Sequence, residues 1–236
     1  MRVALTQAVA AVVDVRAYAA GTNPSDDWFD GRAAPAFADR DAQVAAIALR
    51  GAGRVQALPA DEFVLILEGR LEIEGEAGTL PVDAGTGAVL PIGSSFAWRA
   101  SDDLLAVIYS APTTAPGNAT KPLAIDHDAP LAPSNPPLAE NLIGPTPACR
   151  SHSDYISANG EFACGIWDST PYHRRQIPYR QVELMYLLDG KVSFADAHGS
   201  VSFSAGDVCL FVRGDGCAWL SEEYVRKIYA NQRPAG

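Results

Sequence analysis

The fold is decided by residues 58–98, LPADEFVLILEGRLEIEGEAGTLPVDAGTGAVLPIGSSFAW, because the chain contains this stretch twice. The second copy is PYRQVELMYLLDGKVSFADAHGSVSFSAGDVCLFVRGDGCAW, residues 178–219. An offset of 121 residues, without a gap, aligns Glu62 with Glu183, Gly69 with Gly190, Gly78 with Gly199, Gly85 with Gly206, Gly93 with Gly214 and Trp98 with Trp219. After the tryptophan we expect a slip of one residue, so that Ile108-Tyr109 faces Ile228-Tyr229. Such a repeat predicts a tandem duplication.

Within each copy, apolar and polar residues alternate in short runs that end at glycines. In RLEIEGE, residues 70–76, two apolar side chains face one way and the glutamates the other, and Val192 and Phe194 repeat this pattern in the second copy. Alternation with a period of two residues is typical of half-buried antiparallel strands. Glycine tolerates the positive backbone angles of tight hairpins, so we interpret these glycines as turns. The sequence therefore predicts an all-β protein with few helices.

The composition limits the classes of partner. A chain of 236 residues is long enough for one large or two small domains, and 48% hydrophobic against 19% charged residues excludes a disordered chain. The 18 basic and 28 acidic residues give a net charge of −10, which argues against nucleic acid and against an anionic membrane surface as partners. No apolar run is long enough for a membrane-spanning helix.

Cysteine usage favours the cytoplasm. The four cysteines, all in the second half and without a CxxC pair, are Cys149, Cys164, Cys209 and Cys217. We interpret them as reduced thiols. The first 21 residues, MRVALTQAVAAVVDVRAYAAG, resemble a secretory signal only faintly, because polar and charged residues interrupt the apolar region. We therefore expect no cleaved signal.

Two motifs resemble those of the cupin superfamily. Glutamate, six residues and glycine form the end of the first cupin motif, and Glu62 to Gly69 and Glu183 to Gly190 both fit it. The second cupin motif begins with glycine, five residues, proline, one residue and glycine. The stretch Gly85 to Gly93 matches it in full, whereas the second copy has Val212 in place of the proline. The resemblance implies a bicupin, with two tandem jelly-roll barrels in one chain.

The last part of the sequence extends the resemblance from the cupin superfamily to one of its subfamilies. Residues 204–230 resemble the cupin subfamily that includes ureidoglycine aminohydrolase and the ethanolamine-utilisation cupins, on the basis of Trp219, Arg226, Lys227 and Tyr229. This subfamily implies a nitrogen-containing or ureide-like ligand. The expected division is an N-terminal barrel at 1–113, a Pro-rich connecting segment at 114–148 and a C-terminal barrel at 149–236. We expect the connecting segment to carry one strand near 123–125 and to pack along the barrels.

The standard cupin metal site is predicted to be absent from both copies. That site uses two histidines and the glutamate of the first motif with one histidine of the second, and its ligands must converge on one ion. The positions for the histidines hold Val55, Gln56, Ala57, Leu58 and Phe96 in the first copy, and Gln176, Ile177, Pro178, Tyr179 and Cys217 in the second. We therefore expect no metal cofactor. A non-standard divalent site of Glu183, Cys217 and either His173 or Gln176 remains open as the alternative.

The second copy is predicted to hold the working site. Around Glu62 the first copy offers Val55, Gln56, Leu58 and Phe96, an almost wholly apolar set, so we interpret that barrel as a scaffold. The predicted ligand pocket consists of Gln176, Tyr179, Glu183, Tyr186, Arg213, Cys217 and Trp219. Hydrogen-bonding groups among aromatic faces are typical of small-ligand sites.

Two of these residues have competing interpretations. Glu183 is the candidate catalytic residue if its burial raises its pKa, and a remnant of the motif if a backbone amide or Tyr179 satisfies it. Cys217 is a candidate nucleophile, but no histidine base is near it in sequence, so an inert buried thiol is favoured.

The leading functional hypothesis is a metal-free bicupin that binds a small polar metabolite in its C-terminal barrel. The alternative is an enzyme with a non-standard metal site that acts on such a compound. A structural or regulatory partner of another enzyme is a third hypothesis, without positive support in the sequence. We also expect a homodimer, because barrel edges and the N-terminal apolar run VALTQAVAAVV, residues 3–13, need to be covered.

Overall fold

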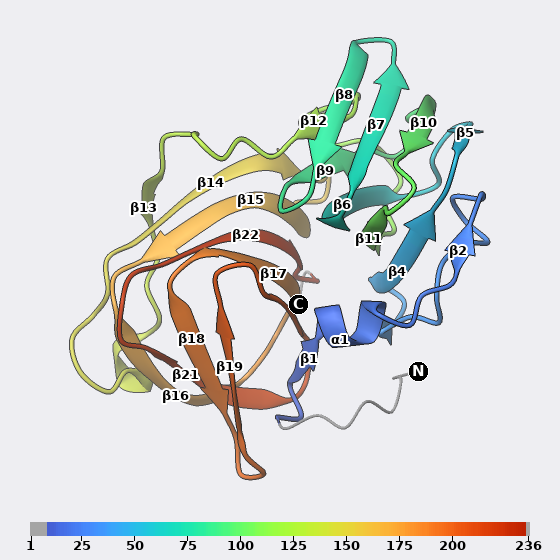
Figure 1. The fold of residues 1–236 in the computed structure, drawn as a ribbon. Coiled ribbons are helices and arrows are strands. Elements are labelled where there is room, and N and C mark those ends of the chain that lie inside the picture. Colours follow the sequence, from blue (N-terminus) through green and yellow to red (C-terminus); the bar gives the residue numbers. More distant parts are fainter. Residues whose placement is uncertain (1–8, 235–236) are drawn as a thin grey trace.

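The computed structural model describes residues 9–234, and within them the chain forms two β-barrels side by side (Figure 1). The larger sheet of the N-terminal barrel contains, in spatial order, β12 (Leu123–Ala124), β9 (Gly87–Leu90), β6 (Asp61–Glu68), β11 (Leu105–Ala111), β4 (Gln43–Leu49) and β2 (Pro24–Ser25), with β3 (Phe37–Ala38) also paired to β4. Its smaller sheet contains β5 (Ala52–Val55), β10 (Phe96–Ala100), β7 (Arg70–Gly75) and β8 (Gly78–Asp83).

The C-terminal barrel repeats this arrangement. Its larger sheet contains β1 (Val12–Asp14), β20 (Val208–Phe211), β17 (Val182–Asp189), β22 (Val225–Gln232), β15 (Phe162–Ser169), β14 (Cys149–Ile156) and β13 (Ala132–Ser134). Its smaller sheet contains β16 (Tyr172–Pro178), β21 (Gly216–Ser221), β18 (Lys191–Ala195) and β19 (Ser200–Ser204). The helices of the described chain are α1 (Val15–Ala19) and the 3-10 turn η1 (Ala139–Asn141). The predicted all-β bicupin is confirmed.

Strand pairing confirms the duplication and corrects one detail of it. Glu62 faces Leu90 and Glu183 faces Phe211, so the offset of 121 residues holds for both members of each pair. The expected slip after the tryptophan is wrong. In the first barrel Tyr109 faces Phe63. In the second barrel the counterpart of Phe63 is Leu184, and the residue that faces it is Ala230. The two closing strands, β11 and β22, therefore keep the same offset, and Tyr109 corresponds to Ala230 rather than to Tyr229.

The glycines that punctuate the repeat adopt the backbone conformation that turns require. Gly69 and Gly190, which directly follow β6 and β17, have φ of 73° and 79°. At Gly190 a Cβ atom would also lie 2.0 Å from the Tyr224 carbonyl oxygen, so this position excludes larger residues by contact as well as by backbone angle.

The core strands are buried on both faces because the two barrels pack on each other. Val64 and Ile66 of β6 point into the N-terminal barrel, and Phe63 and Leu65 point into a core that both barrels share. In β17, Leu184 joins the same shared core, while Met185 points into the C-terminal barrel. This double burial explains why β6 reads as a continuous apolar run rather than as an alternating strand.

Segments outside the repeat tie the barrels together. Strand β1, from the N-terminal part, pairs with β20 of the C-terminal barrel, and α1 follows it between the barrels (Figure 1). The described part of the N-terminal apolar run, Val9 to Val13, is buried there except for the half-buried Ala10, so the run gives no separate reason to expect a dimer; residues 3–8 lie outside the described part. The connecting segment adds β12 to one barrel and β13 to the other, and so packs along both.

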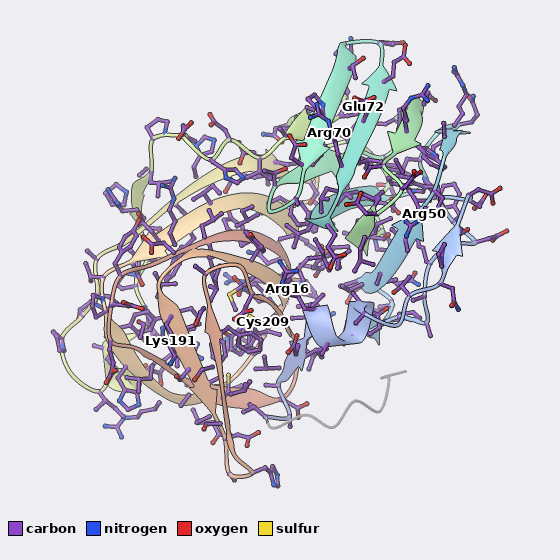
Figure 2. The ribbon with its side chains drawn as sticks, in the orientation of Figure 1. Arg16, Arg50, Arg70, Glu72, Lys191 and Cys209 are labelled. Carbon is purple, nitrogen blue, oxygen red and sulfur yellow. The ribbon has the colours of Figure 1, made fainter. Side chains whose placement is uncertain are left out.

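All four cysteines are buried free thiols, as expected, and Figure 2 shows Cys209 inside the C-terminal barrel. No helix within residues 9–234 is long and apolar enough to cross a membrane.

Candidate ligand site in the C-terminal barrel

The N-terminal barrel is filled by its own side chains. Glu62 is 1% exposed, and Arg32 Nη2 lies 2.8 Å from its Oε1. Ser110 Oγ donates to Oε1 at 2.7 Å and Trp28 Nε1 donates to Oε2 at 3.1 Å. The Trp28 ring meets Phe96 edge to face, with centroids 5.3 Å apart. A smaller pocket of about 290 Å³ lies beside the Glu62–Arg32 pair. The scaffold role expected for this barrel stays a prediction.

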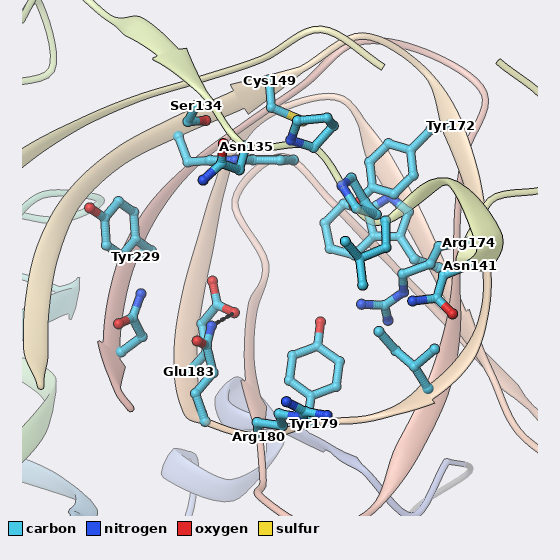
Figure 3. Close-up of a pocket in the computed structure, with 18 of the residues that line it drawn as sticks. Ser134, Asn135, Asn141, Cys149, Tyr172, Arg174, Tyr179, Arg180, Glu183 and Tyr229 are labelled. Carbon is cyan, nitrogen blue, oxygen red and sulfur yellow. Dashed lines mark hydrogen bonds between the residues drawn. The ribbon is translucent and has the colours of Figure 1, made fainter. Parts of the chain in front are cut away.

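The C-terminal barrel instead contains an open cavity of about 1070 Å³ (Figure 3). Strands β14, β15, β16, β17, β21 and β22 supply its walls, and the connecting segment at 134–141 lies along its mouth. The two barrels therefore differ in their interiors although their strands correspond.

An ion pair lies at the floor of this cavity. Lys227 Nζ is 2.8 Å from Glu183 Oε1, and the two side chains are 7% and 9% exposed. Gln181 Nε2 donates to the other carboxylate oxygen at 2.9 Å. The ammonium group also lies 4.8 Å from the centroid of the Trp167 ring and 5.5 Å from that of Trp219. Aromatic faces attract cations, so this site holds the ammonium group by several contacts.

Lys227 is specific to the second barrel. It faces Leu187, and the residue that faces the corresponding Ile66 in the first barrel is Ala106. The carboxylates of the two repeats are thus neutralised by cations at non-equivalent positions, Arg32 in one barrel and Lys227 in the other.

The wall beside this pair is aromatic and carries a second buried cation. Tyr172 stacks on Trp219 with centroids 5.3 Å apart, and Tyr179 stacks on Phe211 at 4.3 Å. Arg174 is 8% exposed, and its guanidinium lies 5.2 Å from the centroid of the Tyr179 ring. Burial raises the pKa of both tyrosines, although Arg174 opposes this shift, so their hydroxyl groups stay protonated at neutral pH.

Three of the seven predicted pocket residues line the cavity: Tyr179, Glu183 and Trp219. The structure places Gln176 elsewhere because β16 contains a bulge between Arg174 and Ile177. The bulge adds one residue, so Ile177 rather than Gln176 faces Cys217 and lines the cavity, while Gln176 is exposed. A shift of one residue moves a side chain to the opposite face of a strand.

The other three lie outside the cavity for separate reasons. Tyr186 is on the face of β17 opposite to Glu183 and packs against the core shared by the barrels. Arg213 pairs with Asp39 at 2.6 Å and with Asp41 at 3.2 Å, and so connects the two halves of the chain. Cys217 is fully buried, and burial raises its pKa to about 11, so its thiol is a poor nucleophile at neutral pH.

Sequence reasoning missed the two buried cations of the site, Arg174 and Lys227. For Lys227 a signal existed, since lysine rarely lies in a strand that is otherwise buried, as it does in VRKIYA, residues 225–230. For Arg174 the polar run HRRQ, residues 173–176, gave no indication of which side chains point inward.

The donor set does not fit a cupin metal ion. No three His, Cys, Asp or Glu side chains within residues 9–234 gather closely enough to hold one. Glu183 is occupied by Lys227, and His173 alternates with the inward-pointing Tyr172 and Arg174 and does not line the cavity. The non-standard set of Glu183, Cys217 and either His173 or Gln176 is therefore not assembled.

Comparison with known proteins identifies the class. Residues 156–229 match the EutQ-like cupin domain. A cupin 2 conserved barrel domain protein from Leptotrichia buccalis has 10% identity and a TM-score of 0.62, over 98% of this chain and all of that one, which shows the shared fold. The chain is thus a member of the cupin superfamily.

A further structure identifies the family. A protein of unknown function from Pseudomonas syringae pv. tomato str. DC3000, assigned to the DUF861 family, is 30% identical, with a TM-score of 0.81 over 88% of this chain and 89% of that one. Our chain belongs to this family. Protein Ylba from E. coli, also of the DUF861 family, has 13% identity and a TM-score of 0.52 over 83% of this chain and 79% of that one. No functionally curated protein matches the sequence.

Proposed function

We propose that the chain binds a small polar metabolite in its C-terminal barrel and that no metal holds this ligand. The observation that carries the proposal is the contrast between the barrels: Trp28 and Arg32 fill the first, whereas a cavity of about 1070 Å³ stands open above Glu183 and Lys227 in the second. Cavities of this size with a few convergent polar groups on apolar walls are typical of small-ligand sites.

The family resemblance favours a nitrogen-containing or ureide-like compound. The polar lining supports this choice because the Asn231 amide can donate and accept hydrogen bonds, and the Glu183 carboxylate can accept them. Amide and urea groups present the complementary set of N–H donors and carbonyl acceptors.

Binding is tested by dialysing the purified protein against a metabolite extract and identifying retained compounds by mass spectrometry. The perturbation is Ser151→Trp, which fills the cavity from β14, and the matched control is Ser202→Trp, at an exposed position of β19. We expect the wild type and the control to retain the same compound and Ser151→Trp to lose it. Retention that Ser151→Trp leaves unchanged would move the ligand out of this cavity.

The absence of metal is tested by elemental analysis after purification without a metal-affinity tag. We expect less than stoichiometric Mn, Fe, Ni and Zn, because Lys227 supplies the charge that a cation would bring to Glu183. A stoichiometric metal that is lost in Glu183→Gln would instead support the enzyme hypothesis with a non-standard metal site.

Cytoplasmic location and a homodimer stay predictions. The first rests on the free cysteines and the second on exposed edge strands such as β8 and β19. Static light scattering at micromolar concentration decides between a monomer of 24.9 kDa and a dimer.

A further inference from the structure

The cavity of the C-terminal barrel concentrates positive charge in an acidic protein. Among the described residues that line it, the cations are Arg174, Arg180, Lys227 and Arg233, whereas the carboxylates are Glu140 and Glu183. The whole chain carries a net charge of −10. Clefts lined by one sign of charge raise the local concentration of ligands of the opposite sign. This cavity therefore favours an anion.

Arg174 is the buried member of this group that lacks a counter-charge. Lys227 is paired with Glu183, and Arg180 and Arg233 are exposed at the mouth. Within residues 9–234, Arg174 takes part in no ion pair with a carboxylate, and its Nε has no hydrogen-bond partner. Figure 3 shows its side chain directed into the cavity, beside Tyr179 and across from Glu183.

The partners that Arg174 does have are neutral. Its Nη2 donates to the Cys217 carbonyl oxygen at 3.1 Å, and the ring and hydroxyl group of Tyr179 lie against it. A buried charge without a counter-charge is costly. A guanidinium presents five N–H donors in a planar fork that matches a carboxylate in two parallel hydrogen bonds. The open donors and the uncompensated charge of Arg174 therefore favour a carboxylate as its partner.

The jelly-roll barrel itself does not require an arginine at this position. Arg174 faces Trp219, and the residue that faces the corresponding Trp98 is Gly53. There the Trp98 ring occupies the space, and a Cβ atom on Gly53 would lie 2.6 Å from it. The unpaired guanidinium thus occurs only in the barrel that contains the large cavity, which ties it to a ligand rather than to folding.

We infer that the ligand is a small carboxylate that Arg174 binds through its guanidinium, with a flat, unsaturated body packed against the aromatic wall of Tyr172, Tyr179 and Trp219. This inference rests on the proposed function and adds the chemical class of the ligand. Rings and unsaturated groups gain offset-stacked or edge-to-face contacts on such a wall.

The test uses 4-fluorobenzoate and its neutral isostere 4-fluorobenzamide as probes, titrated into the wild-type protein and followed by fluorine NMR. We expect the carboxylate to bind at least about tenfold more tightly than the amide, which is the ratio that one well-formed charged contact supplies. This comparison needs no substitution. Equal binding, tighter binding of the amide, or no binding of either probe would overturn the inference.

Two variants assign the selectivity to the residue. Arg174→Met should lower the affinity for 4-fluorobenzoate about tenfold and leave that for 4-fluorobenzamide nearly unchanged, whereas Arg175→Met, at the exposed neighbouring position, should change neither. Arg174→Lys keeps a cation and removes the planar fork. It replaces Arg174→Met in this comparison if the methionine variant does not fold. Unchanged selectivity in a folded variant would remove Arg174 from the site.

The experiments distinguish failure of the carboxylate inference from failure of the proposed function. If dialysis retains a neutral or cationic metabolite that Ser151→Trp loses, the cavity is a ligand site and the carboxylate inference fails alone. If nothing is retained and neither probe binds, both fail together.

Discussion

Replacement of Lys227 by methionine tests whether the floor of the cavity depends on the internal ion pair. Methionine keeps most of the apolar stem and removes the ammonium group, so packing between Trp167 and Trp219 is largely preserved. What is lost is the charge 2.8 Å from Glu183 Oε1. The carboxylate then stays buried, with Gln181 as its remaining side-chain donor.

The expected loss follows from the burial of the pair. Breaking a buried ion pair by removing one partner costs about 3–5 kcal/mol, because it leaves an uncompensated charge. Both side chains are less than a tenth exposed, which places the pair in this class. The cavity beside them admits water to the carboxylate, so we expect the lower end, about 3 kcal/mol of unfolding free energy.

Urea unfolding of Lys227→Met, Glu183→Gln and the double variant measures this loss and the coupling between the two residues. We expect the double variant to be about 2 kcal/mol more stable than the sum of the single losses implies. Arg70→Met is the control, since Arg70 lies 3.2 Å from Asp83 on an exposed hairpin (Figure 2) and should lose less than about 1 kcal/mol. Additive losses, or a Lys227→Met loss no larger than that of the control, would refute the reasoning.

Three further predictions concern the closed barrel, the paired glutamates and the thiols. Trp28→Ala should reduce the free energy of unfolding by about 3–5 kcal/mol in urea and leave binding of 4-fluorobenzoate unchanged, because the ring fills only the first barrel. Glu183→Gln should raise the affinity for that probe roughly tenfold, because it removes a negative charge from the cavity, whereas Glu62→Gln should not; equal effects would contradict the assignment of the site. Iodoacetamide should leave Cys217 unlabelled in the folded protein at pH 7.5, because its raised pKa of about 11 keeps the thiol protonated until the pH approaches that value; rapid labelling of the folded protein would show that it is accessible and ionised.

The fold was predictable from the sequence because its signals are local and repeated. Period-two alternation and glycine turns are signals that extend over a few residues, and both occur in each copy of the repeat, 121 residues apart. The slip after the tryptophan was wrong because it was inferred from two similar dipeptides, whereas the register of β22 is set by its pairing with β17. Side-chain identity at one position is weaker evidence for register than the face that the strand must bury.

The site was predictable only in part, because its lining depends on tertiary detail. Glu183 and Trp219 follow from the repeat, since their counterparts occupy the same strand positions. Gln176 was excluded by a single bulged residue in β16, and nothing in the sequence announces that bulge. Tyr186 could have been excluded from the sequence, because three residues along a strand from Glu183 is an odd step and places it on the other face.

The source of the cation explains why one barrel is closed and the other open. A buried carboxylate retained in both repeats needs a counter-charge wherever no metal is held. In the first barrel the positive charge comes from Arg32, on the segment that also inserts Trp28. The same segment therefore neutralises Glu62 and fills the barrel interior. In the second, Lys227 is part of the barrel wall, on β22, and nothing has to enter from the mouth. Neutralising Glu183 from within its own sheet therefore leaves the interior free for a ligand.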